Sequence, residues 1–316
     1  MNKFEDSILD ISHNYYKYLM SLENVNGIGL GFKYINDVNT FKPCIHVLVE
    51  KKVNDTYLSK NNIIPKSYMG ITTDVIEVGN HQLLSSPGIP GKFRPLEGGI
   101  SISCISDTGT GTLGCIVRKK KLDYFQYFML TNNHVVAGFN TISIGTPIIQ
   151  PGYFCGGSFP EDIVGRLKDF VPIQSANETD LNPPENYADA ALVKIYNKAL
   201  ISNKLRVIGN LKGTNTAQLG ETIVKVGFMT TQTLGSVESL GTTTKIQTLP
   251  NKIALFKDQI RAKITVAKGD SGSVAVNNND EVVGLLFTGY SEKRQAYLNN
   301  INTVLNYFNV EIYIGN

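Results

Sequence analysis

In Gly269-Asp270-Ser271-Gly272-Ser273, a serine lies on a predicted sharp turn between two apolar segments. Glycine, aspartate and serine each favour turns for separate physical reasons, so the motif alone is compatible with an ordinary loop. A turn of this kind also brings a hydroxyl and backbone N–H groups to one point, which is the geometry that acyl transfer needs. The motif therefore predicts a nucleophile if a base and an orienting acid exist elsewhere in the chain.

The general base is predicted to be a histidine, because a serine hydroxyl is a weak nucleophile near neutral pH. Of the four histidines, His134 follows the apolar run 128–130 at the point where polar residues begin, as expected at the end of a strand. His46 lies within an alternating strand, and the surroundings of His13 and His81 show no such break. We assign the base to His134.

The orienting acid is predicted to be Asp189, at the mouth of the apolar strand 190–195. Burying a carboxylate without a partner costs several kcal/mol, so a partner is expected. The imidazole of His134 satisfies this need and is in turn held in the tautomer that accepts the serine proton. Three other acids of this interval lie in polar, loop-like stretches where solvent satisfies them: Asp162, Asp169 and Asp180.

Three motifs in the order His134, Asp189 and Ser271 carry a family resemblance: Thr-Asn-Asn-His-Val, Asp-Ala-Ala-Leu-Val and Gly-Asp-Ser-Gly-Ser. From about Leu96 to the C-terminus the chain resembles the chymotrypsin/trypsin superfamily of serine proteases. The stretch 225–237 resembles the start of the second barrel of bacterial trypsin-like peptidases. The N-terminal extension is similar to that of the plant narrow-leaf type.

The resemblance implies a mainly β, chymotrypsin-like fold of two antiparallel six-stranded β-barrels, with the triad in the cleft between them. The first barrel, about 95–200, would supply His134 and Asp189, and the second, about 205–292, would supply Ser271. Residues 293–316 would add a C-terminal helix and strand. The backbone N–H groups of Gly269 and Ser271 would form the oxyanion hole.

Two departures from the best-known members remove no catalytic atom: Ser273 follows the motif in place of glycine, and no cysteine follows His134. The chain also has no Ile-Val-Gly-Gly type start whose freed amino group could order the site. In animal enzymes the aspartate at the position of Asp270 serves that route. Here we expect it to make a local hydrogen bond.

Substrate preference is predicted from the strand 282–289, which should form a pocket wall. Phe287, Thr288 and Gly289 would pair with the substrate backbone as an added strand. Thr265 holds the position that resembles the pocket base, and none of these residues is charged. A basic or acidic substrate side chain would require a buried opposite charge or an array of donors. We therefore expect an apolar or small residue on the acyl side of the cut.

Composition agrees with a globular protein. The 316 residues suggest about two domains, and 42% of them are hydrophobic. The 29 glycines and the short Val/Ile/Thr runs favour antiparallel β structure. The basic run 118–121 and the pair 51–52 are interpreted as strand ends or hairpin tips, so no nucleic-acid partner is expected. The sequence shows no signal-peptide core and no membrane-spanning run, which predicts a cytoplasmic protein without a membrane partner.

The four cysteines have no metal-ligand spacing, and we expect neither a metal nor another cofactor. Cys104 and Cys115 lie on consecutive strand-like runs, but a reducing cytosol favours free thiols. Cys155 is a weaker alternative nucleophile, because no histidine is near it in the sequence.

Residues 1–90 form a predicted α+β domain ahead of the protease domain, 91–316. A helix is expected over 8–22, strands over 26–33, 43–52 and 72–78, and a linker over 83–91. Regulation, oligomerisation, removal as a pro-segment and the covering of a barrel edge remain open as its role. At the other end, a helix is expected over 295–308 and a strand-like tail over 310–314.

The sequence therefore predicts a serine endopeptidase that hydrolyses polypeptides through an acyl-enzyme, with an uncharged residue on the acyl side of the cut. The alternative is a catalytically silent adaptor on the same fold that binds extended peptides by strand addition. Whether the chain forms a homo-oligomer remains open.

Overall fold

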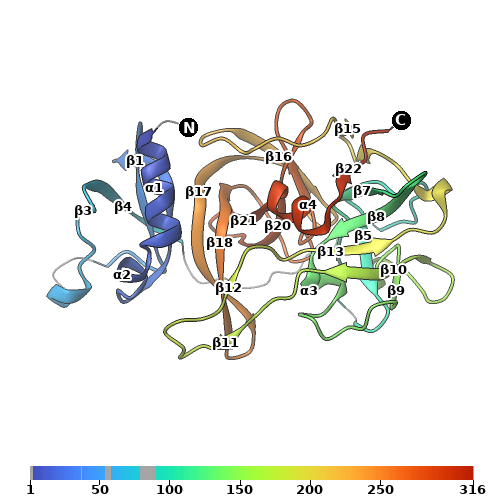
Figure 1. The fold of residues 1–316 in the computed structure, drawn as a ribbon, viewed down its shortest axis with the longest axis horizontal. Helices are drawn as coiled ribbons and strands as arrows, with labels where there is room; N and C mark the ends of the chain where they lie inside the picture. The colour runs from blue at the N-terminus through green and yellow to red at the C-terminus, as the bar shows by residue number, and fades with distance from the viewer. Residues whose placement is uncertain (1–2, 37, 54–57, 79–89, 108, 316) are drawn as a thin grey trace.

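The computed structural model describes residues 3–36, 38–53, 58–78, 90–107 and 109–315. His81 and the predicted linker up to residue 89 lie outside the described residues. Strands dominate the described part and helices are short, so the fold is mainly β as predicted (Figure 1).

The larger sheet has twelve strands in the order β11-β18-β21-β20-β19-β16-β17-β1-β2-β4-β3, with β12 also paired to β18. Because β17 also pairs with β18, each of the six strands β16 to β21 pairs with two others of this set. The strands of this sheet are β1 (Val25–Ile35), β2 (Val38–Val49), β3 (Ser67–Tyr68), β4 (Ile71–Glu77), β11 (Ala176–Asn177), β12 (Glu185–Asn186), β16 (Thr222–Gly227), β17 (Thr231–Leu249), β18 (Lys252–Lys263), β19 (Val274–Val276), β20 (Val282–Tyr290) and β21 (Gln295–Asn300).

The second sheet has eight strands in the order β22-β7-β8-β13-β10-β9-β5-β6 and lies on the other side of the molecule (Figure 1). A separate pair joins β14 (Lys204–Leu205) to β15 (Gly209–Asn210). The strands of the eight-stranded sheet are β5 (Ser101–Cys104), β6 (Gly111–Thr112), β7 (Cys115–Lys120), β8 (Phe125–Thr131), β9 (Pro147–Ile149), β10 (Ile163–Phe170), β13 (Ala191–Lys194) and β22 (Glu311–Ile312).

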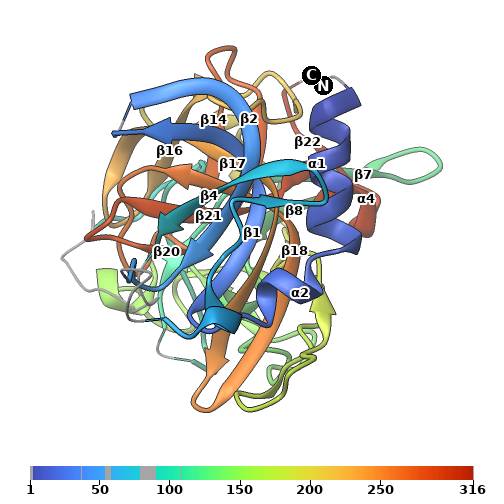
Figure 2. The ribbon, with the colours of Figure 1, turned by 90° about the vertical axis from the view of Figure 1, so that its left-hand side faces the viewer.

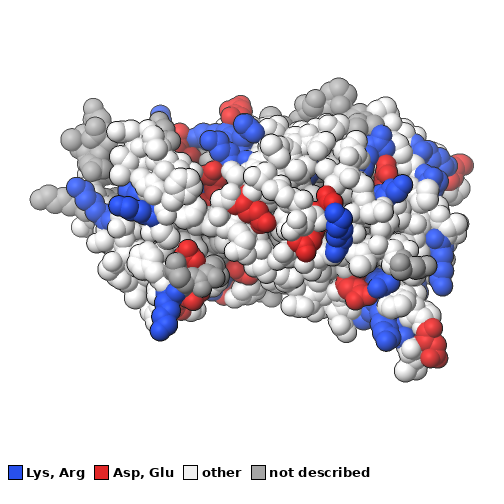
Figure 3. All heavy atoms as spheres, turned by 90° about the horizontal axis from the view of Figure 1, so that it is seen from above, with Lys and Arg blue, Asp and Glu red and all other residues white. Residues whose placement is uncertain are grey.

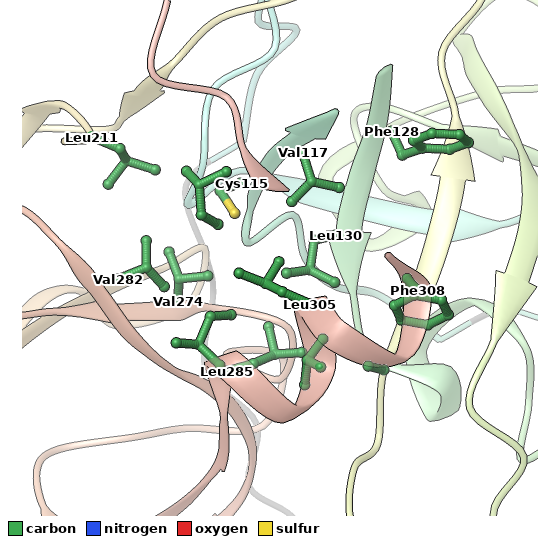
Figure 4. Close-up of a cluster of buried hydrophobic side chains, with 14 of the residues drawn as sticks. Cys115, Val117, Phe128, Leu130, Leu211, Val274, Val282, Leu285, Leu305 and Phe308 are labelled. Atoms are coloured by element: carbon green, nitrogen blue, oxygen red, sulfur yellow. The ribbon is translucent and has the colours of Figure 1, made fainter. Parts of the chain in front are cut away.

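A shared hydrophobic core joins the two sheets (Figure 4). The helix α4 (Ile301–Phe308) contributes Leu305 and Phe308 to it. Burying each large apolar side chain contributes about 1.5–3 kcal/mol, so this core holds the two sheets in one arrangement. From the eight-stranded sheet it takes Cys115, Val117, Phe128 and Leu130, and from the twelve-stranded sheet Val274, Val282 and Leu285.

The predicted helix over 295–308 is wrong in its first half. Residues 295–300 form β21, which pairs with β18 on one side and β20 on the other, and α4 begins only at Ile301. The Asn300 side chain accepts a hydrogen bond from the N–H of Asn302 and so caps the helix. The two strand partners decide the conformation of 295–300, because the apolar residues of this short run fit either periodicity. The predicted tail is present as the short strand β22.

The N-terminal residues extend the twelve-stranded sheet. β1 pairs antiparallel with β17, β2 with β1, and β4 runs parallel to β2, so the three predicted strands are present (Figure 2). The predicted helix begins earlier and is broken in two, as α1 (Lys3–Asn14) and α2 (Lys17–Met20). Three single-turn 3-10 helices complete the described structure: η2 (Lys60–Asn62), η3 (Tyr153–Cys155) and η4 (Lys198–Leu200).

A polar contact joins the N-terminal helices to the segment that leads to Asp189. The Tyr16 hydroxyl donates to Glu185 (2.8 Å), and the Lys257 ammonium lies 3.2 Å from the same carboxylate. Burial and the Glu185 contact raise the pKa of Tyr16 to about 12. Burial alone would raise the pKa of Glu185, but the hydrogen bonds from Tyr16 and Lys257 outweigh it and lower that pKa.

We expect Tyr16→Phe to lower the free energy of unfolding at pH 7 by about 1 kcal/mol, a small value because Glu185 is partly exposed and solvent screens it. Since the pKa of Glu185 is lowered on folding, its contribution is present above its ordinary value of 4.5 and is lost as the pH falls through the lowered one. Urea unfolding at pH 7 and at pH 3 tests this. A variant whose deficit is as large at pH 3 as at pH 7 contradicts it.

The cysteines and the surface complete the description. All four cysteines are free, and burial raises the pKa of Cys115 to about 12. The face seen in Figure 3 carries basic and acidic side chains interspersed with one another. Among the described residues, every helix is too short or too polar to cross a membrane.

Candidate active site

His134 lies on the short helix α3 (Asn133–Val136), directly after β8 ends at Thr131. The buried side chain of Asn133 donates to the side chain of Asn140 (2.7 Å) and to the carbonyl of Val171 (2.8 Å) and so anchors this turn. The imidazole stacks on the ring of Phe139 at 5.7 Å between centroids. Its side chain is 21% exposed, so one edge is accessible to a substrate.

Asp189 lies just before β13 and is the partner of His134. Its Oδ2 lies 2.5 Å from His134 Nδ1, and its Oδ1 accepts the backbone N–H of His134 at 3.2 Å. The carboxylate is 3% exposed, so the imidazole supplies the partner that burial requires. With Nδ1 donating to the carboxylate, Nε2 is free to accept a proton.

The turn around Ser271 is held by both sheets. The N–H of Thr112 on β6 donates to the Ser271 carbonyl (2.8 Å), and the N–H of Gly272 donates to Leu286 on β20 (2.9 Å). Gly272 has a φ of +95°, and a Cβ there would collide with the Thr112 carbonyl. Glycine is therefore required at this position.

The Ser271 backbone lies beside α3, and the hydroxyl hydrogen-bonds to another strand. A Cβ on Gly111 would meet both Val135, the neighbour of His134, and the Ser271 carbonyl, which places the serine beside α3. Ser271 Oγ donates to the carbonyl of Phe287 at 3.3 Å. Within the described residues no hydrogen bond joins it to His134, so the serine–histidine contact of a working triad is open in this structure.

The predicted oxyanion hole consists of two backbone N–H groups of the serine turn. In the described part of the chain neither the N–H of Gly269 nor that of Ser271 has a hydrogen-bond acceptor. Gly269 has a φ of +107°, and the side chains of Phe228 and Met229 fill the space a Cβ would need. The predicted oxyanion donors therefore have no hydrogen-bond acceptor among the described residues.

Asp270 is fully buried and pairs with Lys225 at 2.9 Å. Burial lowers the pKa of Lys225, and the attraction of Asp270 opposes this. The local hydrogen bond expected for Asp270 is present, but within a larger network. The carboxylate also accepts the Thr230 hydroxyl (2.6 Å) and three backbone N–H groups, those of Ala267, Met229 and Thr230. Lys225 lies in an apolar strand pattern of β16, and an isolated lysine in such a pattern was the signal that sequence reasoning missed.

A cavity of about 550 Å³ lies beside His134 and Asp189. The tip of the β17–β18 hairpin forms one wall, which no sequence motif indicated. The predicted residues Phe287 and Thr288 line the cavity together with Phe139, Phe256, Ile246, Gln247, Thr248, Leu249 and Pro250.

The other two predicted substrate residues lie outside this lining. Thr265 accepts a hydrogen bond from Arg294 Nε (3.2 Å) on its hydroxyl. Gly289 lies against the Val266 side chain, which would be 2.7 Å from a Cβ there. Val266, the neighbour of Thr265, therefore packs against the backbone of Gly289. A larger cavity of about 770 Å³, between α2 and residues 181–185, is lined by none of the three predicted triad residues.

One buried group of described residues brings metal-ligating atoms together: Cys44, His46 and Asp74. Both ring nitrogens of His46 have partners, Phe32 at 2.7 Å and Arg261 at 3.2 Å, and Lys33 lies 3.0 Å from Asp74. Burial raises the pKa of Cys44 to about 12, and burial together with Arg261 lowers that of His46 to about 3. A cation does not fit a protonated thiol beside a lysine and an arginine.

Two family models and several solved structures are similar to this chain. The trypsin family model matches residues 124–310, and the model described as the Narrow Leaf 1 N-terminal domain matches residues 8–78. No curated protein matches the chain. Among solved structures, the chain is similar to Thermobifida fusca protease A, with 17% identity and a TM-score of 0.51 over 69% of this chain and 98% of that one. A Nocardiopsis protease shows 17% identity and a TM-score of 0.50 over 68% and 97% of the two chains. At these identities the solved structures show a shared fold.

Proposed function

The chain belongs to the trypsin family of serine proteases, and from this premise we propose that it is an endopeptidase that uses Ser271, His134 and Asp189. In this proposal the strands β16 to β21 form one barrel of the family and the eight-stranded sheet the other. Residues 1–90 are an N-terminal domain attached through β1 to a protease domain, 91–316. The observation that carries the proposal is the 2.5 Å contact between His134 Nδ1 and a buried Asp189 carboxylate.

In the acylation step, Ser271 Oγ forms a bond to the scissile carbonyl carbon while His134 Nε2 takes the hydroxyl proton. Asp189 stabilises the imidazolium that results. The N–H groups of Gly269 and Ser271 bind the oxygen that becomes negative, each such donor being worth about 3 kcal/mol. The C–N bond then breaks, and His134 returns the proton to the leaving amine. Water hydrolyses the acyl-enzyme by the same path in reverse.

In this proposal, substrate binding frees the Ser271 hydroxyl to turn toward His134. Ser271 Oγ now donates to the Phe287 carbonyl, on the strand predicted to pair with the substrate. A substrate N–H that donates to this carbonyl, as in strand addition, competes with the hydroxyl. The hydroxyl is then released toward His134. A contact that is open in the free enzyme and closes on binding is common at catalytic sites.

We propose an uncharged residue on the acyl side of the cut, because the cavity beside His134 is lined by Phe139, Phe256, Phe287 and the hairpin tip and offers Asp189 only as the partner of His134. A mixed-peptide library followed by mass spectrometry tests this, with cleavage products enriched in apolar or small residues at that position. Glutamate enrichment would instead assign recognition to the exposed Arg294 beside Thr265. A profile dominated by glutamate or arginine sinks the proposal.

A silent adaptor that binds extended peptides is the second candidate, favoured by the missing hydrogen bond between Ser271 and His134. The same library separates the two functions. An adaptor retains peptides uncleaved on the immobilised protein, whereas a protease releases two products from each.

We also propose that the protein is cytoplasmic, because its free thiols fit a reducing compartment.

A further inference from the structure

The backbone of Asp189 is held from the opposite sheet. Asn299 on β21 accepts the Asp189 N–H with Oδ1 (3.0 Å) and donates to the Asp189 carbonyl with Nδ2 (3.1 Å). Its side chain is completely buried. One amide therefore satisfies both backbone groups of the predicted catalytic acid, and a buried group left unpaired would cost about 1–3 kcal/mol.

A second side-chain amide, that of Asn132, also hydrogen-bonds the backbone of Asp189, but from the side of the eight-stranded sheet. Asn132, two residues before His134 and directly after β8 of the eight-stranded sheet, donates to the same Asp189 carbonyl at 2.7 Å. Among the described residues, Asn299 alone reaches the Asp189 N–H. Asn132 therefore ties the acid to its own sheet, whereas Asn299 ties it to the sheet that carries the serine.

Asn299 also contacts the strand that holds the serine turn. Its Nδ2 donates to the carbonyl of Leu285 on β20 (3.1 Å). The next two residues of β20 accept from the serine turn: Leu286 from the N–H of Gly272 and Phe287 from Ser271 Oγ. One side chain thus connects the backbone of the acid to the strand that positions the nucleophile.

We infer that Asn299 is a positioning residue that sets the Asp189 carboxylate, and through it His134, relative to Ser271. The inference rests on the proposed function for its kinetic consequence, but the placement of Asp189 against His134 is observable without catalysis. A displacement near 1 Å at a catalytic group can cost about 10²-fold in rate.

The test compares Asn299→Leu with Gln259→Leu. Gln259 pairs with Asn299 across β18 and β21 and is equally buried, and its amide donates to the Tyr187 carbonyl at 3.0 Å, two residues before Asp189. Both substitutions remove a buried amide that hydrogen-bonds the backbone of the segment 187–189, so both should destabilise the fold. Only Asn299→Leu removes contacts to Asp189 itself.

We expect Asn299→Leu to lower kcat about 10²-fold with KM within about twofold, because peptide binding does not involve this residue. The proton NMR spectrum should lose, or shift upfield, the low-field signal of the proton between His134 and Asp189. Gln259→Leu should keep both the signal and kcat within about threefold. Asn299→Ser, a smaller change with a hydroxyl in place of the amide, should fall between them and serves if the leucine variant does not fold.

An unchanged low-field signal in both Asn299 variants overturns the inference, as does an equal loss of kcat in Asn299→Leu and Gln259→Leu at matched stability. If the wild type shows the signal but cleaves no peptide, the proposed function fails, and the signal in the variants still decides the role of Asn299.

Discussion

Ser271→Ala is expected to lower kcat/KM for peptide hydrolysis by at least about 10⁴-fold, the loss typical of removing a triad nucleophile. The alanine variant keeps the free N–H groups of Gly269 and residue 271, so a residual rate from the oxyanion hole and substrate binding is expected. Initial rates on a peptide identified from the library give the measurement.

The fold should tolerate this substitution. Among the described residues, the Ser271 hydroxyl makes one hydrogen bond, to the Phe287 carbonyl. At 3.3 Å this bond is long and weak. We expect the free energy of unfolding to change by less than about 1 kcal/mol. An activity loss with intact thermal unfolding therefore reports chemistry rather than folding.

Cys155→Ser is the matched control, because Cys155 is the other nucleophile that the sequence offers and is partly exposed. The predicted result is unchanged activity. If this control variant is inactive while Ser271→Ala cleaves at more than a tenth of the wild-type rate, the assignment of the nucleophile is wrong.

The second large effect is expected from Asp270→Ala, which leaves the Lys225 ammonium buried without its partner. Breaking a buried ion pair by removing one member costs about 3–5 kcal/mol. Three backbone N–H groups also lose their acceptor, those of Ala267, Met229 and Thr230. Because Ala267 begins the turn that reaches Ser271, we expect the variant to lose hydrolysis as well as stability.

A double variant separates the effect of the unpaired Lys225 ammonium from the effect of the acceptor that the serine turn loses. Lys225→Met added to Asp270→Ala removes the stranded ammonium, so part of the stability should return. Activity should stay low, because the backbone donors of the turn remain without an acceptor. Urea unfolding and peptide hydrolysis of the two variants measure the two effects. A loss below about 1 kcal/mol in Asp270→Ala, or full activity in the double variant, contradicts this role.

The sequence indicated the three proposed triad residues because each has a conspicuous local setting, and histidine is also rare, with four in the chain. His134 ends an apolar run and Asp189 begins one, and the structure places the two 2.5 Å apart. The serine turn also has a local signal, since both of its glycines adopt positive φ, although the atoms that a Cβ would meet there belong to distant residues such as Thr112 and Phe228. Such patterns can be recognised in the sequence without knowledge of the rest of the fold.

The residues that were missed act through pairs far apart in the chain. Lys225 meets Asp270 across 45 residues, and Asn299 meets Asp189 across 110. The hairpin tip near Leu249 reaches the site only because β17 and β18 are long. The same limit explains the error over 295–300, where partners on both sides impose a strand on a pattern that also fits a helix.

The N-terminal strands were predicted correctly as elements, whereas their placement was left open, with the covering of a barrel edge as one of the roles considered. Their alternating pattern indicates a buried face, and that face is covered by α1 and by the other strands. Nothing local to β1 shows that its free edge pairs with β17. The N-terminal strands are therefore part of the same twelve-stranded sheet as β20, the strand that holds the serine turn.

The most direct measurement is the site of covalent labelling by a fluorophosphonate probe, mapped by tandem mass spectrometry of the wild type, Ser271→Ala and His134→Ala. The account predicts one phosphonyl group on Ser271 in the wild type and none in either variant, with all three proteins folded. A folded wild type that remains unlabelled, or a label on any other residue, would contradict the claim that Ser271 is a nucleophile activated by His134.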